Sequence, residues 1–316
     1  MLNQFKFLKI FAGTSAKALG QAVCQQLKVK PGKLKLEEFA CGEKYVQIGE
    51  SVRGMNCFVI ATASQDVNSD LMELFLIIDA LKRSLAKYIH VVLPHFGYAR
   101  QDKITDPREP ISAKLMAGLL EKAGAKHIIT LDLHSPQIQA FFEKPVDHLT
   151  VKKIFLTYFQ KKCLAKPVVV SPDAGGAKNA EKFARLLGTS LAILHKTRPR
   201  HNEVEITKIV GDVKNCSAIL FDDLVDTAGS CVAAAKVLRQ AGAREIFLAA
   251  SHAVFSGEAR SRLRQADFKE IVVTDSIPQD FGELTNVKVL SIRKLLAQTI
   301  AGVHLGRSVS QFWGAL

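Results

Sequence analysis

The chain has 316 residues, of which 48% are hydrophobic and 23% are charged, a composition typical of a globular protein with one large or two mid-sized domains. No apolar run approaches the roughly 18 residues that a membrane helix needs, so we expect no membrane partner. The net charge is +13, yet no arginine-rich run with interleaved aromatic residues accompanies it. We therefore expect no nucleic-acid partner. A polyphosphate site, or an oligomer with anion-binding pockets, explains the basicity equally well.

The six cysteines are scattered and form no CxxC pair, so neither a zinc site nor a disulfide framework is indicated. Reduced thiols favour a cytoplasmic location. The first residues alternate between apolar and polar side chains and include Lys6 and Lys9. This pattern predicts a first strand rather than a signal peptide.

In the first half of the chain, short apolar runs alternate with amphipathic stretches, which predicts successive βαβ units. We expect strands at 5–12, 57–61, 89–93 and 126–131, helices at about 16–27, 70–87 and 113–123, and a strand pair or flap at 35–54.

The second half repeats this alternation. We expect strands at 167–170, 190–195, 204–210, 217–221, 245–251, 270–274 and 288–291, and helices at 150–161, 231–240, 257–265 and 292–302. Residues 123–134 align without gaps on residues 241–252, and both segments follow an amphipathic helix. The sequence thus predicts an α/β protein of two related halves joined near residues 145–150, with the active site in the cleft between them.

The most informative stretch is 219–230, where a buried strand is followed by Asp-Asp-Leu-Val-Asp-Thr-Ala-Gly-Ser and then by a helix. Backbone N–H groups at a helix N-terminus, with Gly229 allowing close approach, form a seat for a phosphate. Asp222 and Asp223 are poor partners for a phosphate but good acceptors for sugar hydroxyls or ligands for a hydrated divalent cation. A phosphate seat beside a diol seat suits a ribose 5-phosphate moiety. The alternative is an ordinary capped turn with solvated acids.

Four more segments follow predicted strand ends, where open α/β sheets bind ligands. The segment after residue 93 contains Arg100, Gln101 and Lys103, which could hold phosphates or form a solvated loop. His134 could hold a metal ion or be structural. The segment 171–180, with Asp173, predicts a second anion seat or a plain turn, and the basic segment 195–202 predicts a lid or a solvated hairpin tip.

Taken together, these segments resemble the ribose-phosphate diphosphokinases over the whole chain. The resemblance is carried by GTSAKALG, ESVRG, PHFGYARQDK, REPISAKL, DLHSPQIQAFF, SPDAGGAK, HKTRPR, IVGDV, DDLVDTAGS and SVSQFW. Phosphoribosyltransferases share only the DDLVDTAGS region and the general βαβ plan. The resemblance implies two phosphoribosyltransferase-like halves, each a mostly parallel sheet flanked by helices.

It also implies a domain plan and a reaction. The half at 1–147 would contribute to ATP binding, the half at 148–302 would carry the ribose 5-phosphate and diphosphate loops, and the tail at 303–316 would pack at a regulatory or subunit contact. The family transfers the diphosphoryl group of ATP to O1 of ribose 5-phosphate with Mg²⁺ as cofactor. The alternatives are a non-catalytic regulatory homologue and a phosphoribosyltransferase.

The resemblance assigns a role to each matching position. Ribose 5-phosphate would be bound by Asp222, Asp223, Asp226, Thr227, Ala228, Gly229 and Ser230. The catalytic residues would be Lys196, Arg198 and Asp226. ATP would be bound by Phe39, Cys41, Glu43, Arg100 and Gln101. The diphosphate loop would contain Asp173, Gly175 and Gly176, and Mg²⁺ would be held by His134 and Asp173.

Regulation is a further expectation from the resemblance, which implies a homo-oligomer such as a hexamer, with phosphate and ADP as effectors. The matching regulatory positions are Ser51, Arg53, Arg108, Ser308 and Ser310. Two positions depart from the family pattern: Cys41 replaces the usual Asp or Asn, and Pro136 replaces a small residue. Cys41 therefore bears on nucleotide preference, and Pro136 on the regulatory site.

Overall fold

The computed structural model describes residues 4–197 and 205–312, with the backbone alone at 196–197 and 205–207. These residues form two compact units. Unit 1 holds residues 4–150, 276–278 and 291–312, and unit 2 holds residues 151–275 and 279–290. Within the described part of the chain, no helix is long and apolar enough to cross a membrane.

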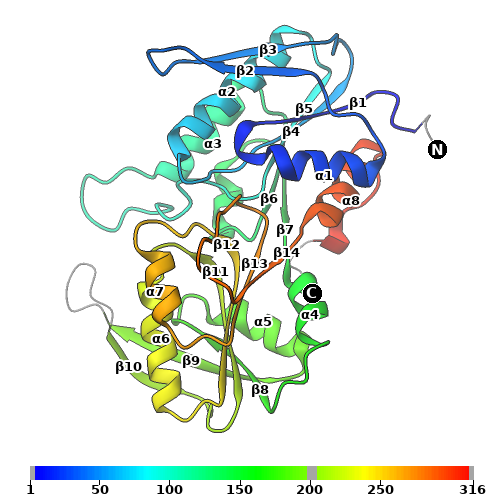
Figure 1. Cartoon of the computed structure of the whole chain (residues 1–316). Coiled ribbons are helices and arrows are strands. Elements are labelled where there is room, and N and C mark those ends of the chain that lie inside the picture. Colours follow the sequence, from blue (N-terminus) through cyan, green and yellow to red (C-terminus); the bar gives the residue numbers. More distant parts are fainter. Residues whose placement is uncertain (1–3, 198–204, 313–316) are drawn as a thin grey trace. The chain divides into compact units, whose positions relative to one another are not determined.

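Unit 1 is built on a five-stranded sheet whose strands are all parallel, in the order β1-β4-β5-β6-β7 (Figure 1). The strands are β1 (Leu8–Ala12), β4 (Asn56–Ile60), β5 (Tyr88–Leu93), β6 (His127–Leu131) and β7 (Val146–Leu149). A separate antiparallel hairpin consists of β2 (Leu34–Glu38) and β3 (Lys44–Ile48). Consecutive strands of the main sheet are neighbours, so the strand order does not reverse within it.

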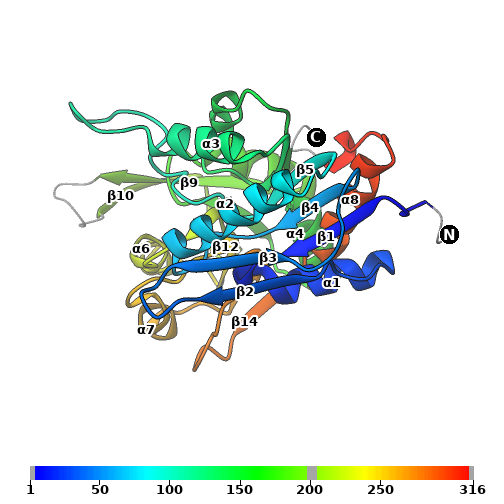
Figure 2. The same cartoon turned by 90° about the horizontal axis from the view of Figure 1, so that it is seen from above.

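Helices cover both faces of this sheet, with α1 and α8 on one side and α2 and α3 on the other (Figures 1 and 2). The elements are α1 (Lys17–Leu27), α2 (Val67–Arg83), α3 (Ser112–Ala123), α8 (Arg293–His304) and the short 3₁₀ helices η1 (Thr14–Ala16), η2 (Pro136–Phe141) and η3 (Ser310–Phe312). Helix α2 illustrates why they form. The Asp66 side chain accepts a hydrogen bond from the Ser69 N–H, residues at helical spacing are buried, and Lys82 and Arg83 lie in the last turn.

Unit 2 contains a seven-stranded sheet in the order β10-β9-β8-β11-β12-β13-β14, in which β10 alone runs antiparallel to its neighbour. Its strands are β8 (Pro167–Ser171), β9 (Ser190–Thr197), β10 (Glu205–Val210), β11 (Ser217–Val225), β12 (Glu245–Ala253), β13 (Glu270–Thr274) and β14 (Val287–Leu290). Its helices are α4 (Lys152–Phe159), α5 (Ala177–Leu187), α6 (Gly229–Gln240) and α7 (Ala259–Gln265). The predicted α/β class with mostly parallel, helix-covered sheets is confirmed.

The two faces of the unit 2 sheet are packed differently. On the α6 and α7 side the core is mainly aliphatic, whereas the α4 and α5 side is rich in phenylalanine. Phe183 of α5 stacks on Phe221 of β11 with ring centroids 4.4 Å apart. Burying each such ring contributes roughly 2–3 kcal/mol relative to leaving it in water. This packing fixes β11 directly before the acidic motif that it carries.

The last helix belongs to a different unit from the one expected. The sequence analysis assigned residues 148–302 to the second half and 303–316 to a separate tail, but residues 291–312 pack within unit 1. There α8 packs against α1. The amphipathic pattern of α8 requires a buried face but does not identify the surface that covers it.

Candidate active site

The order of the strands in unit 2 marks one position as the place where a ligand can bind. From β8 the chain continues to β9 on one side, whereas β11, β12, β13 and β14 follow one another on the other side. The strand order therefore reverses between β8 and β11. In open α/β sheets, ligands bind in the crevice at the carboxyl ends of the strands at such a reversal.

Acidic residues occupy this point. Asp173 follows β8 directly, and Asp222 and Asp223 lie in the last part of β11. The sequence analysis ended this strand at Phe221, but β11 continues to Val225 because its backbone pairs with β12 as far as Ala253. The two aspartates are thus held on a rigid strand rather than on a loop.

The carboxylates at this reversal repel one another. Loss of hydration on burial raises the pKa of Asp222 well above its usual range, and the charges of Asp223 and Asp173 raise it further. The Asp223 N–H donates a 2.9 Å hydrogen bond to Asp222 Oδ1, which offsets this only in part. Sugar hydroxyls or a cation would relieve the repulsion, and this is the electrostatic pattern of a binding site.

The loop after β11 ends in the N-terminus of α6, and its backbone is shaped for close approach. Ala228 adopts a left-handed conformation with φ 61°, and its carbonyl accepts a 3.0 Å hydrogen bond from the Val232 N–H. Such conformations form the backbone concavities that bind anions. The first N–H groups of a helix lack partners within the helix, so the start of α6 is suited to a phosphate.

The loop after β8 is shaped by Asp173 itself. One oxygen of its carboxylate accepts a 2.9 Å hydrogen bond from the Gly176 N–H, and its backbone carbonyl accepts one of 2.7 Å from the Ser171 hydroxyl. Neither Gly175 nor Gly176 has a positive φ, so the loop contains no left-handed glycine turn. The absence of side chains here keeps the backbone accessible in front of α5.

In unit 1, three of the expected nucleotide-binding residues lie together on the turn between β2 and β3. The Phe39 N–H donates to the Glu43 carbonyl at 2.8 Å, and Gly42 turns the chain with φ +91°. Phe39 is 52% exposed, so it is not a core residue and its ring is available for stacking. Cys41 and Glu43 are also exposed.

The segment after β5 positions Arg100 and Gln101. The Gln101 side chain accepts a hydrogen bond from the Ser112 hydroxyl, and its carbonyl accepts a 3.2 Å bond from the Ala113 N–H at the start of α3. Arg100 is exposed next to this anchored residue. The Arg100 guanidinium is thus carried by a segment that hydrogen bonds to the start of α3 hold in place.

His134 lies after β6 and is exposed. The turn that carries it is tied to β7, because the Leu133 N–H donates a 2.9 Å hydrogen bond to Nε2 of His148. His134 belongs to unit 1, whereas Asp173, the other expected Mg²⁺ ligand, belongs to unit 2.

Comparison with known proteins now identifies the family. Residues 8–124 match the N-terminal domain of ribose phosphate pyrophosphokinase, and residues 201–314 match the phosphoribosyl synthetase-associated domain. The chain is 46% identical over 308 residues to the ribose-phosphate pyrophosphokinase of Caldanaerobacter subterraneus subsp. tengcongensis, covering 97% of this chain and 98% of the relative. The Bacillus subtilis enzyme of the same name is 45% identical over 314 residues, covering 98% of this chain and 99% of the relative.

The chain belongs to the ribose-phosphate pyrophosphokinase family.

A solved structure agrees with this assignment. The phosphoribosylpyrophosphate synthetase of Mycobacterium smegmatis superposes with a TM-score of 0.89 at 42% identity, covering 94% of this chain and 99% of that one. The resemblance stated from the motifs is confirmed.

The family uses a divalent metal, and the carboxylates of this chain are suited to a metal ion that is also bound by phosphate. Among residues 4–197 and 205–312, no group of three or more His, Cys, Asp or Glu side chains could hold a metal ion alone. Mg²⁺ typically binds through one or two carboxylates and takes its other ligands from phosphates and water. The carboxylates at the strand reversal therefore suit a cation that arrives with its phosphate substrate.

The structure describes the expected regulatory residues, but it describes the expected catalytic residues of the basic segment only in part. Lys196 lies in β9, where only the backbone is described, and Arg198 lies outside the described residues. Of the expected regulatory residues, Ser51, Arg53 and Arg108 are exposed in unit 1.

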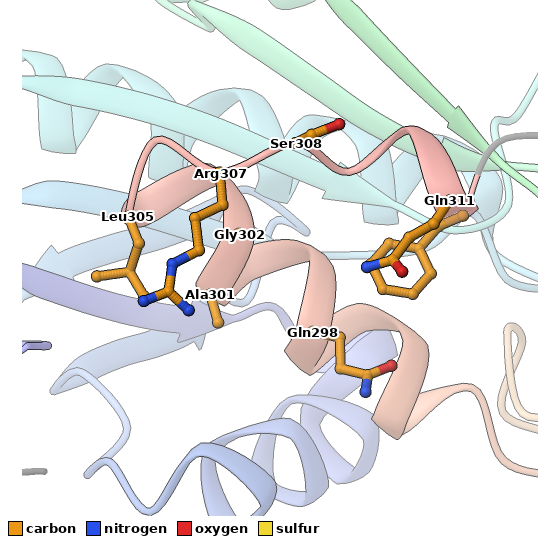
Figure 3. A pocket seen from close by; sticks show the side chains of 8 residues that line it. Gln298, Ala301, Gly302, Leu305, Arg307, Ser308 and Gln311 are labelled. Atoms are coloured by element: carbon orange, nitrogen blue, oxygen red, sulfur yellow. The ribbon is translucent and has the colours of Figure 1, made fainter.

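The other two expected regulatory residues lie near the end of the described chain. The hydroxyls of Ser308 and Ser310 are 2.9 Å apart. A hollow lies beside them, lined by residues of α8 and by the segment that follows it, including Arg307 and Gln311 (Figure 3).

Two residues near the acidic motif were not found from the sequence. The Ser256 hydroxyl donates to Asp226 Oδ1, and Arg262 Nη1 donates to the Thr227 carbonyl at 3.2 Å. The only signal available was the Phe-Ser-Gly turn directly after a strand end, and its contact with residues 30 positions away cannot be read from local pattern.

Proposed function

We propose that the chain transfers the diphosphoryl group of ATP to O1 of ribose 5-phosphate, giving 5-phosphoribosyl 1-diphosphate and AMP. The observation that carries this proposal is the strand reversal of unit 2, where repelling carboxylates stand beside the N-terminus of α6. A ligand that offers both a phosphate and a vicinal diol matches this arrangement. Family membership adds the second substrate, ATP.

In the reaction, O1 of the sugar forms a bond to the β-phosphorus of ATP while the bond from that phosphorus to the oxygen bridging to the α-phosphate breaks. AMP leaves with the bridging oxygen. This transfer requires positioning and neutralisation of charge rather than a protein nucleophile. We assign Asp226 to orienting O1–H or accepting its proton.

The remaining roles follow the chemistry of each residue. The 5-phosphate is bound by Thr227, Ala228, Gly229 and Ser230, and the ribose hydroxyls by Asp222 and Asp223. ATP contacts Phe39, Cys41, Glu43, Arg100 and Gln101. The diphosphate is wrapped by the loop with Asp173, Gly175 and Gly176, and charge in the transition state is stabilised by Lys196 and Arg198.

The cofactor in this proposal is Mg²⁺, with His134 and Asp173 as its protein ligands. When bound, Mg²⁺ neutralises phosphate charge. What supports this role is the excess of carboxylate at the strand reversal and the exposure of His134. In the same proposal the enzyme is a cytoplasmic homo-oligomer, a hexamer, that responds to phosphate and ADP through Ser51, Arg53, Arg108, Ser308 and Ser310.

The test is AMP formation by the purified protein with ribose 5-phosphate, ATP and Mg²⁺, each omitted in turn and with inorganic phosphate varied. We expect AMP only when all three are present, together with 5-phosphoribosyl 1-diphosphate. A folded protein that binds ribose 5-phosphate but forms no AMP at any phosphate concentration would instead be a regulatory homologue. Consumption of 5-phosphoribosyl 1-diphosphate with a free base would identify a phosphoribosyltransferase.

A further inference from the structure

One segment of unit 2, residues 254–262, contacts the last residue of β11 and the two residues of the β11–α6 loop that follow it. The Val225 carbonyl accepts hydrogen bonds from the N–H groups of residues 254 and 255, at 2.9 and 3.1 Å. The Asp226 carboxylate accepts from the Ser256 hydroxyl. The Thr227 carbonyl accepts from Arg262 Nη1 at 3.2 Å. The loop is thus held at three consecutive residues by a segment outside the acidic motif.

This segment is itself rigid. Phe255 is fully buried yet has φ +50°, a conformation that costs a non-glycine residue roughly 1–3 kcal/mol and persists only where the surroundings enforce it. The Gln279 amide donates to the carbonyls of residues 253 and 254 at 2.8 and 2.7 Å. The Phe255 ring also packs edge-on against Phe281, with centroids 6.0 Å apart. The Ser256 hydroxyl is therefore presented from a fixed backbone.

The contact of Arg262 has a geometric consequence for the anion seat. In a trans peptide, the carbonyl of one residue and the N–H of the next point in opposite directions. Because the Thr227 carbonyl points to Arg262 on α7, the Ala228 N–H points away from α7. Arg262 Nη1 also lies 3.6 Å from where a Cβ on Gly229 would stand, so its positive charge is close to the N-terminus of α6.

We propose that Ser256 and Arg262 are positioning residues for the sugar-phosphate substrate. Ser256 orients the Asp226 carboxylate toward the attacking hydroxyl, and Arg262 fixes the Thr227–Ala228 peptide so that its N–H meets the 5-phosphate. This inference rests on the proposed function. It predicts separate kinetic effects, since one residue acts at the reacting end of the sugar and the other at its phosphate end.

For Ser256, the test compares S256A with S256T, which keeps the hydroxyl. S256A should lower kcat about tenfold or more while KM for ATP changes little, because it removes one hydrogen bond that orients a reacting group. S256T should restore most of the loss. The matched control is S261A, because Ser261 is an exposed serine on α7. Equal kcat values for S256A and S261A would overturn the role of Ser256.

For Arg262, the variants are R262M and R262K, with R264M as the matched control on the same helix. R262M should raise KM for ribose 5-phosphate about tenfold with a smaller change in kcat, and R262K should recover part of it. E258Q removes the 2.8 Å ion pair of Arg262 with Glu258 but leaves the contact with Thr227, so it should behave like the wild type. An unchanged KM in R262M would refute the proposal for this residue.

The outcomes also separate this inference from the proposed function. Ribose 5-phosphate binding is measured by calorimetry for every variant, and folding by the thermal midpoint. If the wild type forms no AMP, the proposed function fails, and weaker ribose 5-phosphate binding by R262M would still support the role of Arg262. If the wild type is active and S256A and R262M match their controls, the inference alone fails.

Discussion

Each of the two sheets carries a row of titratable side chains, and the two rows are built in opposite ways. In unit 1, His90 of β5, His127 of β6 and Asp147 of β7 form a chain of contacts across three neighbouring strands. Nδ1 of His90 lies 3.0 Å from Nδ1 of His127, and Nε2 of His127 lies 3.1 Å from Asp147 Oδ2. In unit 2, the carboxylates of Asp173, Asp222 and Asp223 lie close enough that the charges of Asp223 and Asp173 raise the pKa of Asp222.

The contacts of the histidine row are hydrogen bonds between its own side chains. Both contacts form when His90 carries its proton on Nδ1 and His127 carries its proton on Nε2, so that each ring donates once along the row to the carboxylate. Burial, together with the neighbouring His127 and His304, lowers the pKa of His90 to about 3, against an opposing effect of Asp147. His90 is therefore neutral near pH 7, and the row is joined by contacts among its own side chains.

The aspartate row differs, because loss of hydration and the charges of Asp223 and Asp173 raise the pKa of Asp222 well above its usual range. Its repulsion destabilises the ligand-free protein, and a bound ligand removes that cost. The comparison teaches that buried titratable groups alone do not mark a site. What marks one is a group of mutually repelling carboxylates at a position where the strand order reverses.

The largest expected effect comes from removing a charge of the aspartate row. Asp222→Asn should lower kcat/KM for ribose 5-phosphate about a thousandfold, because the site loses one preorganised polar partner of the substrate. Steady-state kinetics at saturating ATP measure this. A loss below about threefold would mean that the self-repelling row is not the substrate site.

The next largest effect is the loss of folding stability at acid pH that His90 of the histidine row causes. The pKa of His90 lies below its ordinary value of 6.5, so between about pH 6.5 and 3 the unfolded chain binds a proton there that the folded protein does not. The stabilisation is complete above that range and is lost as the pH falls. From pH 7 to 4 it should decrease by about 3 kcal/mol.

Urea unfolding at several pH values measures this change for the wild type and for His90→Phe, which keeps the aromatic contact with Phe58. The variant should lose less stability than the wild type over the same range. Parallel pH curves for the two proteins would contradict the assignment to His90.

A smaller effect is expected from breaking the histidine row at its end. Asp147→Leu leaves the partly buried His127 N–H without its carboxylate and should destabilise the protein by about 2 kcal/mol, as measured by urea unfolding at pH 7. The kcat of the folded fraction should change less than about threefold. A large loss of kcat at unchanged stability would show that this row has a catalytic role and would break the comparison.

The smallest effect has the opposite sign. Asp222→Asn should raise the thermal midpoint of the ligand-free protein by about 2–4 °C, because one of the mutually repelling charges is gone. Ribose 5-phosphate with Mg²⁺ should then raise the midpoint of the wild type more than that of the variant. A lower midpoint in the variant would mean that the charge is compensated in the ligand-free state.

Much of this fold could be predicted because the strands of both sheets are short apolar runs with clear breaks. The ends of the helices and strands were harder to predict. β11 continues through two aspartates, which have low strand propensity, because pairing with β12 outweighs that propensity. The helix expected at 70–87 is observed at Val67–Arg83, because Asp66 caps its start and Leu85, with φ +60°, follows its end.

The site was predictable where its residues are consecutive and not where they are distant. The aspartates, the α6 N-terminus and the glycines after β8 all lie in local motifs. Ser256 and Arg262 contact the acidic motif from other elements of unit 2, and a single sequence contains no signal for those contacts. The same limit applies to α8, whose amphipathic pattern fits either unit.

The assignment of residues 291–312 to unit 1 has a consequence for synthesis on the ribosome. The residues of unit 2 are complete at residue 290, whereas unit 1 begins first and lacks α8, the partner of α1, until about residue 304 has been added. Domains generally fold as units while the chain emerges. The apolar face of α1 therefore stays uncovered until the last part of the chain has been made, although α1 itself is among the first elements to emerge.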